Sequence, residues 1–202
     1  MSSGEPAPRS GGRMGNRRLD AVTDPVGVLL RLARSVRGES RPSYYHIDRI
    51  APWLLVGPAL RPEDYDQLAD RGVTHVLDLR AESAGGRAML AELGIEYRRV
   101  PVPNEHPPSD QQLDEVLTWL QEEVLGGTGT LYVHCQGGIG RAPSCSMALL
   151  VSHGYSLGEA HRLVRAARPE ASPSEAQMAW LEHIERRTRM AAPQLPPERE
   201  TR

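Results

Sequence analysis

The sequence has no lysine and no phenylalanine, and only two of its 202 residues are cysteines, Cys135 and Cys145. Two cysteines cannot build the disulfide framework of a small secreted domain, so reduced thiols and a cytoplasmic location are predicted. The histidines show no spacing typical of a metal site, and we expect neither a metal nor a cofactor. These surface or hydrogen-bonded histidines are His75, His106, His153, His161 and His183.

A surplus of positive charge is also missing, since the formal net charge is −2 although all 24 basic residues are arginines. A domain that binds nucleic acid usually carries a strong positive surplus. The arginines fit a high-G+C coding bias, and no nucleic-acid partner is predicted. No apolar run approaches the length of a membrane span, and residues 26–33 are interrupted by Arg31, so we expect a soluble protein without a secretory signal.

Both ends of the sequence have little apolar content. Residues 1–20 and 189–202 are rich in proline and charged or small residues, and both are expected to be disordered. Residues 21–43 form an amphipathic helix and a linker in this prediction, because 25–37 has helical periodicity with arginines on one face. Two hypotheses stay open for this helix: docking on the domain, or weak contact with a membrane surface.

Residues 44–188 are predicted to form one α/β domain. Strands are expected over 50–56, 73–79, 95–102 and 130–134, the first as an edge strand that tolerates proline. The helices between the later strands imply parallel pairing with right-handed crossovers. Capping boxes predict that helices begin after Ser109, Ser156 and Ser172, the last with proline at its first position.

One stretch, residues 133–144 (VHCQGGIGRAPS), places a cysteine between a strand and a glycine-rich loop that leads into a helix. Backbone N–H groups converge at such a helix start, and they favour both a bound anion and a thiolate. Arg141 can offer a bidentate fork to two oxygens of the anion. The candidate nucleophile is Cys135. The candidate phosphate-binding residues are Gln136, Gly137, Gly138, Ile139, Gly140 and Arg141.

The segment HCQGGIGRAPS resembles the His-Cys-x5-Arg signature of the protein tyrosine phosphatase superfamily, and residues 45–185 are similar to its dual-specificity branch. The resemblance implies a mixed, mainly parallel sheet of about five strands flanked by helices. It also implies a cysteinyl-phosphate intermediate on Cys135, with phosphotyrosine, phosphoserine or phosphothreonine proteins as substrates. By the same resemblance His134 bonds backbone near the loop, the alternative being a packed strand-end histidine. Cys145 is expected in the core, with a protective disulfide as the alternative.

The sequence departs from the family pattern at two positions. Asn104 stands where relatives carry an aspartic acid that protonates the leaving group, and an amide cannot supply that proton. Three alternatives remain open: Glu105 acts as the acid, substrates leave without help, or the domain mainly binds phosphate. Ala142 replaces the usual Ser or Thr, as it does in plant-type glucan phosphatases.

Other hypotheses concern the substrate and the second step. Gln177 matches a glutamine that positions water in some branches, or it is an ordinary residue of a first helical turn. Gln136 and Ile139 carry no charge, which argues against polyphosphorylated inositol lipids. Besides phosphoproteins and small phosphomonoesters, phospholipid and glucan phosphate stay as substrates. A phosphate-binding pseudophosphatase and a rhodanese-like sulfurtransferase are the alternatives to a phosphatase, and no oligomeric state is predicted.

Overall fold

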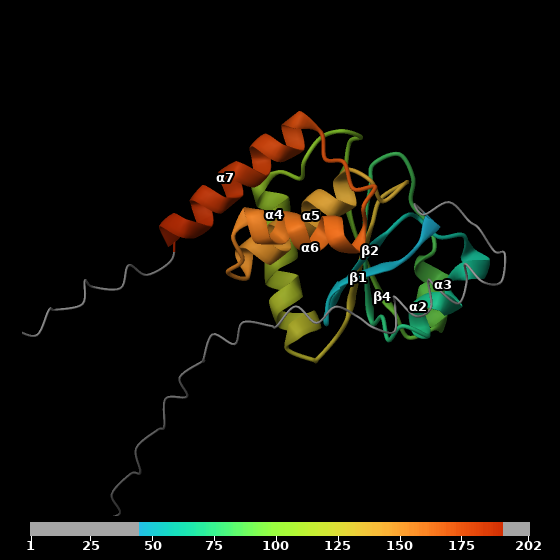
Figure 1. Ribbon diagram of the computed structural model, residues 1–202. Coiled ribbons are helices and arrows are strands. Elements are labelled where there is room, and N and C mark those ends of the chain that lie inside the picture. The colour runs from blue at the N-terminus through green and yellow to red at the C-terminus, as the bar shows by residue number, and fades with distance from the viewer. Residues whose placement is uncertain (1–44, 192–202) are drawn as a thin grey trace, which may run out of the picture.

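The computed structural model describes residues 45–191 (Figure 1). The amphipathic helix expected at 25–37 and the segment 1–20 lie outside the described residues. The last helix ends at Ala191, so the domain boundary expected at 188 falls inside it. Within 45–191, no helix is long and apolar enough to cross a membrane.

Five strands form one mixed sheet in the order β1-β2-β5-β3-β4. Only the β1–β2 pair is antiparallel, and the other three pairs are parallel. This confirms the expected mixed, mainly parallel α/β sheet. The strands are β1 (Asp48–Ala51), β2 (Leu54–Gly57), β3 (His75–Arg80), β4 (Glu96–Val102) and β5 (Leu131–His134).

Helices cover both faces of the sheet, with α4, α5, α6 and α7 on one face and α2 and α3 on the other (Figure 1). Successive strand residues point to opposite faces, so Leu77 and Val133 enter the larger core while Val76 and Tyr132 enter the smaller one. The helical segments are η2 (Pro62–Asp64), α2 (Asp66–Ala69), α3 (Arg87–Glu92), α4 (Asp110–Trp119), the π-helical η3 (Leu120–Leu125), α5 (Arg141–Ser152), α6 (Leu157–Ala167) and α7 (Glu175–Ala191).

The single edge strand expected at 50–56 is wrong, because the segment folds into the β1–β2 hairpin. Proline has no N–H to give to a ladder, and Pro52 lies in the turn, where none is needed. Leu54 and Val56 are buried, and β2 lies inside the sheet between β1 and β5. Of the two strands in this hairpin, β1 is therefore the one at the sheet edge.

The capping boxes at Ser109 and Ser156 are confirmed, whereas the box expected at Ser172 is wrong. Ser174 and Gln177 form it instead: the Ser174 N–H donates to the Gln177 Oε1 at 2.9 Å, and the Gln177 N–H donates to the Ser174 Oγ at 3.2 Å. The Ser172 N–H donates to the carbonyl of Ile139 at 2.8 Å. The Ser172 N–H, which a capping box would bond to the Glu175 side chain, is thus used in a contact with the glycine-rich loop.

Candidate active site

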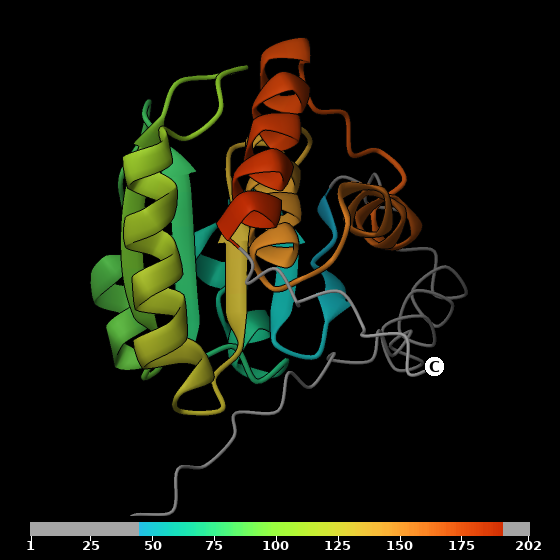
Figure 2. The ribbon, with the colours of Figure 1, turned by 90° about the vertical axis from the view of Figure 1, so that its left-hand side faces the viewer.

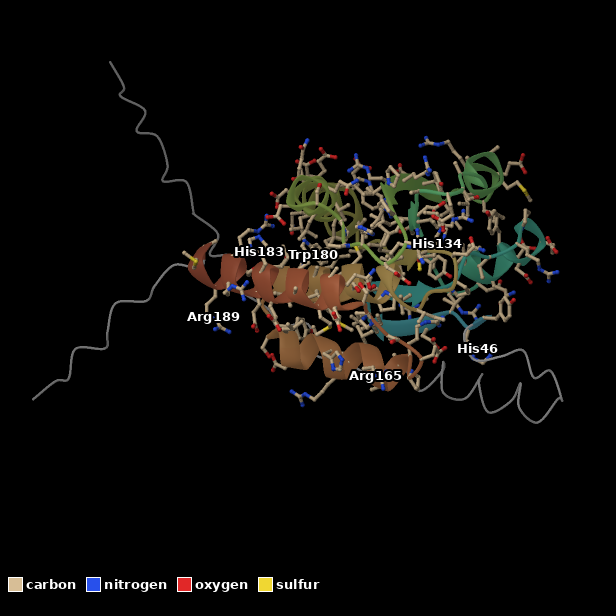
Figure 3. The ribbon with its side chains drawn as sticks, turned by 90° about the horizontal axis from the view of Figure 1, so that it is seen from above. His46, His134, Arg165, Trp180, His183 and Arg189 are labelled. Carbon is tan, nitrogen blue, oxygen red and sulfur yellow. The ribbon has the colours of Figure 1, made fainter. Side chains whose placement is uncertain are left out.

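The predicted loop lies at the carboxyl end of the central strand. Cys135 follows directly after β5, and α5 begins at Arg141. Helix α5 is buried along almost its whole length against β2, β5, α6 and α7. Figure 3 shows His134, the last residue of β5, far from Arg189 near the end of α7. Carboxyl ends of parallel strands are where ligands usually bind in open α/β sheets.

The loop's backbone is oriented by the partners of its carbonyl oxygens, since every carbonyl from Cys135 to Gly140 accepts a hydrogen bond. Among the described residues, no N–H of 136–140 has an acceptor. The N–H groups are therefore left for a ligand, which is the arrangement of an anion-binding nest. The donors are the His134 Nδ1 to Cys135, the Ala59 N–H to Gln136, Arg168 to Gly137 and Gly138, the Ser172 N–H to Ile139, and the Ser144 N–H to Gly140.

Arg168 holds the centre of the loop from inside the protein. Its side chain is fully buried, its Nε donates to the Gly138 carbonyl at 2.6 Å, and its Nη2 donates to the Gly137 carbonyl at 3.1 Å. The Nη1 forms an ion pair with Asp48 at 2.8 Å. The guanidinium thus joins the loop to β1. This role could not be predicted from the sequence, because one arginine among many has no local signature.

Gly138 has a conformation and a contact that only glycine allows. Its φ is +67°, and a Cβ built there would lie 2.4 Å from the Gly57 carbonyl carbon and 2.7 Å from the Arg168 Nη2. At Gly137 a Cβ would meet only the Ile139 side chain, at 3.6 Å. Of these two loop glycines, Gly138 is therefore the one at which the fold requires the absence of a side chain.

The Arg141 side chain is held in a bidentate ion pair. Its two terminal nitrogens donate to the Glu82 carboxylate at 2.7 and 2.6 Å, and Nη1 also donates to the Val102 carbonyl at 2.9 Å. The hydrogen bond from Arg141 lowers the pKa of Glu82 to about 2. Glu82 is consequently ionised at neutral pH and has no proton to give. Its partnership with Arg141 was not anticipated, since the two residues lie far apart in the chain.

His134 is a buried neutral group beneath the loop. Burial lowers its pKa to about 4, although the Asp78 carboxylate, 3.9 Å away, acts in the opposite direction. A neutral ring whose Nδ1 lies 3.3 Å from the Cys135 carbonyl donates its proton there. The Tyr132 ring stacks on the imidazole, with 5.7 Å between the ring centres. The expected bond from His134 to backbone near the loop is thus present.

An open cavity of about 620 Å³ lies in front of the loop. Asn104 lines it, and the adjacent Glu105 has a left-handed backbone with φ of +63°. The Ser174 hydroxyl donates to the Glu105 carbonyl at 2.6 Å, and the Gln177 Nε2 donates to the His106 carbonyl at 3.0 Å. Helix α7 thereby holds the segment that should supply a general acid. The lining residues are Ala81, Glu82, Pro103, Asn104, Gln136 and Arg141.

The remaining candidates have mainly structural surroundings. Gln177 is buried, and its amide bonds Ser174, His106 and the Ser144 hydroxyl, so it caps α7 and joins that helix to α5. Ala142 packs in the core. Cys145 is buried and unpaired, which agrees with the core position predicted for it, and burial raises its pKa to about 12. The alternative of a disulfide with Cys135 is not present.

This geometry agrees with the comparison with protein families, in which residues 50–194 match the family described as Swiss Army Knife protein, DSP-PTPase phosphatase domain. The chain belongs to this phosphatase family. Its members named dual specificity phosphatases are phosphoric monoester hydrolases, and so is this chain. The resemblance seen in the HCQGGIGRAPS segment is confirmed.

Similar proteins cover most of the phosphatase domain. Human dual specificity phosphatase 28 is 32% identical over 152 residues, which are 74% of this chain and 83% of that protein. The solved structure of Tk-PTP in the active form has a TM-score of 0.64 and 30% identity, covering 73% of this chain and 99% of that chain. The amyloplastic phosphoglucan phosphatase DSP4 of Castanea sativa is 32% identical over 132 residues, 59% of this chain but only 35% of that protein.

Proposed function

We propose that this phosphatase domain hydrolyses phosphate monoesters in two steps through a cysteinyl phosphate on Cys135. The observation that carries the proposal is the loop after Cys135: its carbonyls all accept hydrogen bonds, and the N–H groups of 136–140 have no acceptor among the described residues. Three phosphoryl oxygens can be held by those N–H groups and by Arg141. The thiolate, not the thiol, is the nucleophilic form of a cysteine.

In the first step the Sγ thiolate attacks phosphorus, an S–P bond forms, and the P–O bond to the leaving group breaks. The leaving oxygen takes a proton from a general acid. In the second step water gives a proton back to the conjugate base of that acid and attacks phosphorus, the S–P bond breaks, inorganic phosphate leaves and the thiolate returns. Charge spreads over the equatorial oxygens during both transfers, where a preorganised ring of donors is most effective.

Glu105 is the residue we propose as the general acid. Glu82 lines the cavity but is ionised, and Asn104 has no acidic proton, so neither serves. Glu105 adjoins Asn104, and its left-handed backbone is held in place by Ser174. A strained backbone of this kind often marks a functional position. General acid help is typically worth about 100- to 10,000-fold.

Phosphorylated proteins are the substrate class that we propose first. The cavity is open and its rim is uncharged at Gln136, which suits a phosphorylated side chain presented on a larger partner. The relatives named dual specificity phosphatases support the same class. Phosphoglucan is the second candidate, supported by the DSP4 relative and by the alanine at position 142. We propose a cytoplasmic location, on the grounds of the two reduced thiols.

Hydrolysis of para-nitrophenyl phosphate and of a phosphotyrosine peptide tests the proposal. Wild type should turn over both substrates, Cys135→Ser neither, and Cys145→Ala should match wild type because that thiol is buried in the core. If wild type hydrolyses these substrates no faster than Cys135→Ser, the two-step mechanism is wrong and the alternative of a phosphate-binding pseudophosphatase holds. Glu105→Gln should lose activity, and the loss should be largest on substrates with a poor leaving group. Adding Asn104→Asp to that variant should restore the activity.

A further inference from the structure

A histidine and two glutamates converge at the edge of the sheet opposite the active site. His75 begins β3 and Glu96 begins β4, while Glu123 lies in the π-helical η3. One ligand atom from each residue lies within 4.8 Å of the other two. The turn that follows η3 lies at the end of the sheet away from the strand arrowheads (Figure 2). Side chains from three elements, far apart in the chain, thus share one place.

The side-chain hydrogen bond of His75 involves its Nδ1 and leaves its Nε2 without a partner of this kind among residues 45–191. The Thr74 hydroxyl donates to the Thr130 carbonyl at 3.3 Å and accepts from the Thr130 N–H at 2.9 Å. The same hydroxyl lies 2.7 Å from the His75 Nδ1. With the ring proton on Nδ1, this contact is a hydrogen bond donated to the hydroxyl, and the Nε2 lone pair is available to a metal ion. Metal-bound histidines typically donate their other ring N–H to such a partner.

The Nε2 of His75 faces the Glu96 carboxylate, and the Glu123 carboxylate lies close to both residues. The residue is only 8% exposed, and among the described residues Nε2 accepts or donates no hydrogen bond. Its nearest carboxylate oxygen belongs to Glu96, 3.9 Å away.

The carboxylates are placed to complete a metal site. The Trp119 Nε1 donates to the Glu123 Oε2 at 3.0 Å, which orients that carboxylate and leaves its other oxygen free to bind. Glu96 is exposed and has rotamer freedom. Ligand atoms around tetrahedral zinc, with bonds of about 2.0–2.2 Å, lie about 3.4 Å apart. The 3.9 Å between His75 and Glu96 therefore needs only a small side-chain shift.

We propose that His75, Glu96 and Glu123 bind a divalent transition metal of the zinc class, with water as the fourth ligand. Imidazole with carboxylates suits zinc and its first-row neighbours, whereas calcium and magnesium prefer oxygen alone. The ion would join β3, the edge strand β4 and η3, so its role is to clamp the sheet edge, away from phosphate chemistry. The spacing of the histidines could not reveal the site, because two of its ligands are glutamates.

Zinc titration of the full chain tests the site, in a Cys135→Ser background that removes a competing sulfur ligand. We expect one zinc per chain, and a rise in Tm on adding zinc. The affinity should fall at least about tenfold in Glu96→Gln, Glu123→Gln and His75→Gln, with the Tm rise lost. Glu96→Gln and Glu123→Gln change exposed side chains and should leave the fold intact. These two variants therefore keep the test decisive if His75→Gln unfolds.

His183→Gln is the matched control, since His183 and Asp110 form a surface histidine–carboxylate pair at 2.8 Å. Zinc binding should be unchanged in this variant. Cobalt should give a visible d–d absorption without a thiolate charge-transfer band, and Glu123→Gln should abolish it. The proposal would be overturned if the protein showed no saturable zinc binding. It would also be overturned if Glu96→Gln, Glu123→Gln and His75→Gln all bound zinc as tightly as the parent protein, or if only His183→Gln lost zinc binding.

Discussion

The guanidinium of Arg168 donates to the carbonyl of Gly138 at 2.6 Å, although thirty residues separate them in the chain. Through this bond a fully buried arginine on the segment after α6 fixes the orientation of a peptide in the phosphate-binding loop. The same side chain pairs with Asp48 on β1. Loop geometry therefore depends on packing well outside the Cys-x5-Arg segment.

Removal of this clamp should destabilise the domain severely. Arg168→Met leaves Asp48 buried without its cation and two loop carbonyls without donors, so we expect a loss of about 3–5 kcal/mol in the free energy of unfolding. Urea denaturation measures it. Arg187→Met, which removes an exposed pair with Asp114, should cost less than about 1 kcal/mol. Equal losses for the two variants would count against a clamp.

The two adjacent glycines Gly138 and Gly137 should respond differently to alanine. Gly138→Ala places a Cβ against the Gly57 backbone at a left-handed φ, and we expect a loss of more than about 2 kcal/mol and of most phosphatase activity. Gly137→Ala meets only an adaptable side chain and should stay within a few-fold of wild type. Thermal unfolding measures the stability of both variants, and para-nitrophenyl phosphate hydrolysis measures their activity. Wild-type stability and activity in Gly138→Ala would contradict the close contact between Gly138 and the Gly57 backbone.

Neutralising Glu82 should weaken substrate use through Arg141. Glu82→Gln removes one charged oxygen from the fork, and Arg141 becomes less ordered, so kcat/KM should fall roughly 10- to 100-fold. Glu63→Gln, at an exposed pair with Arg61, should leave kcat/KM unchanged. A faster Glu82→Gln enzyme would mean that Glu82 competes with the phosphate for Arg141.

Stability should fall in acid because of His134. Its folded pKa is about 4, below the ordinary 6.5, so the unfolded chain binds a proton first. Stability is therefore full above pH 6.5 and is lost as the pH falls towards 4, by about 3 kcal/mol in total. Urea midpoints from pH 7.5 to 4.5 should decline less in His134→Asn than in wild type. Parallel curves would contradict a buried neutral imidazole.

The sequence predicted those parts of the molecule whose signals are local. The strand, glycine loop and helix around Cys135 occupy the expected positions, and so do the capping boxes at Ser109 and Ser156. Errors arose where tertiary contacts compete with local preference. Ser172 has the residue pattern of a helix cap, but its N–H bonds the Ile139 carbonyl, and the cap moves to Ser174.

The residues that hold the phosphate-binding loop in place could not be predicted from the sequence, because they act through tertiary contacts. Arg168 and Glu82 contact residues of the loop segment that lie thirty residues or more away in the chain. A single sequence shows the residue types but not which arginine is buried. The sheet order β1-β2-β5-β3-β4, which brings these segments together, also depends on pairing that periodicity alone does not specify.

The central claim is that Cys135 carries the phosphoryl group between the two steps. Rapid acid quench during turnover of a fast phosphate ester, followed by peptide mass analysis, tests it most directly. We expect one phosphoryl group on the peptide containing Cys135, none on Cys145 alone, and its absence in Cys135→Ser. Turnover with no phosphorylated cysteine at any quench time, or with the same rate in Cys135→Ser, would contradict the account.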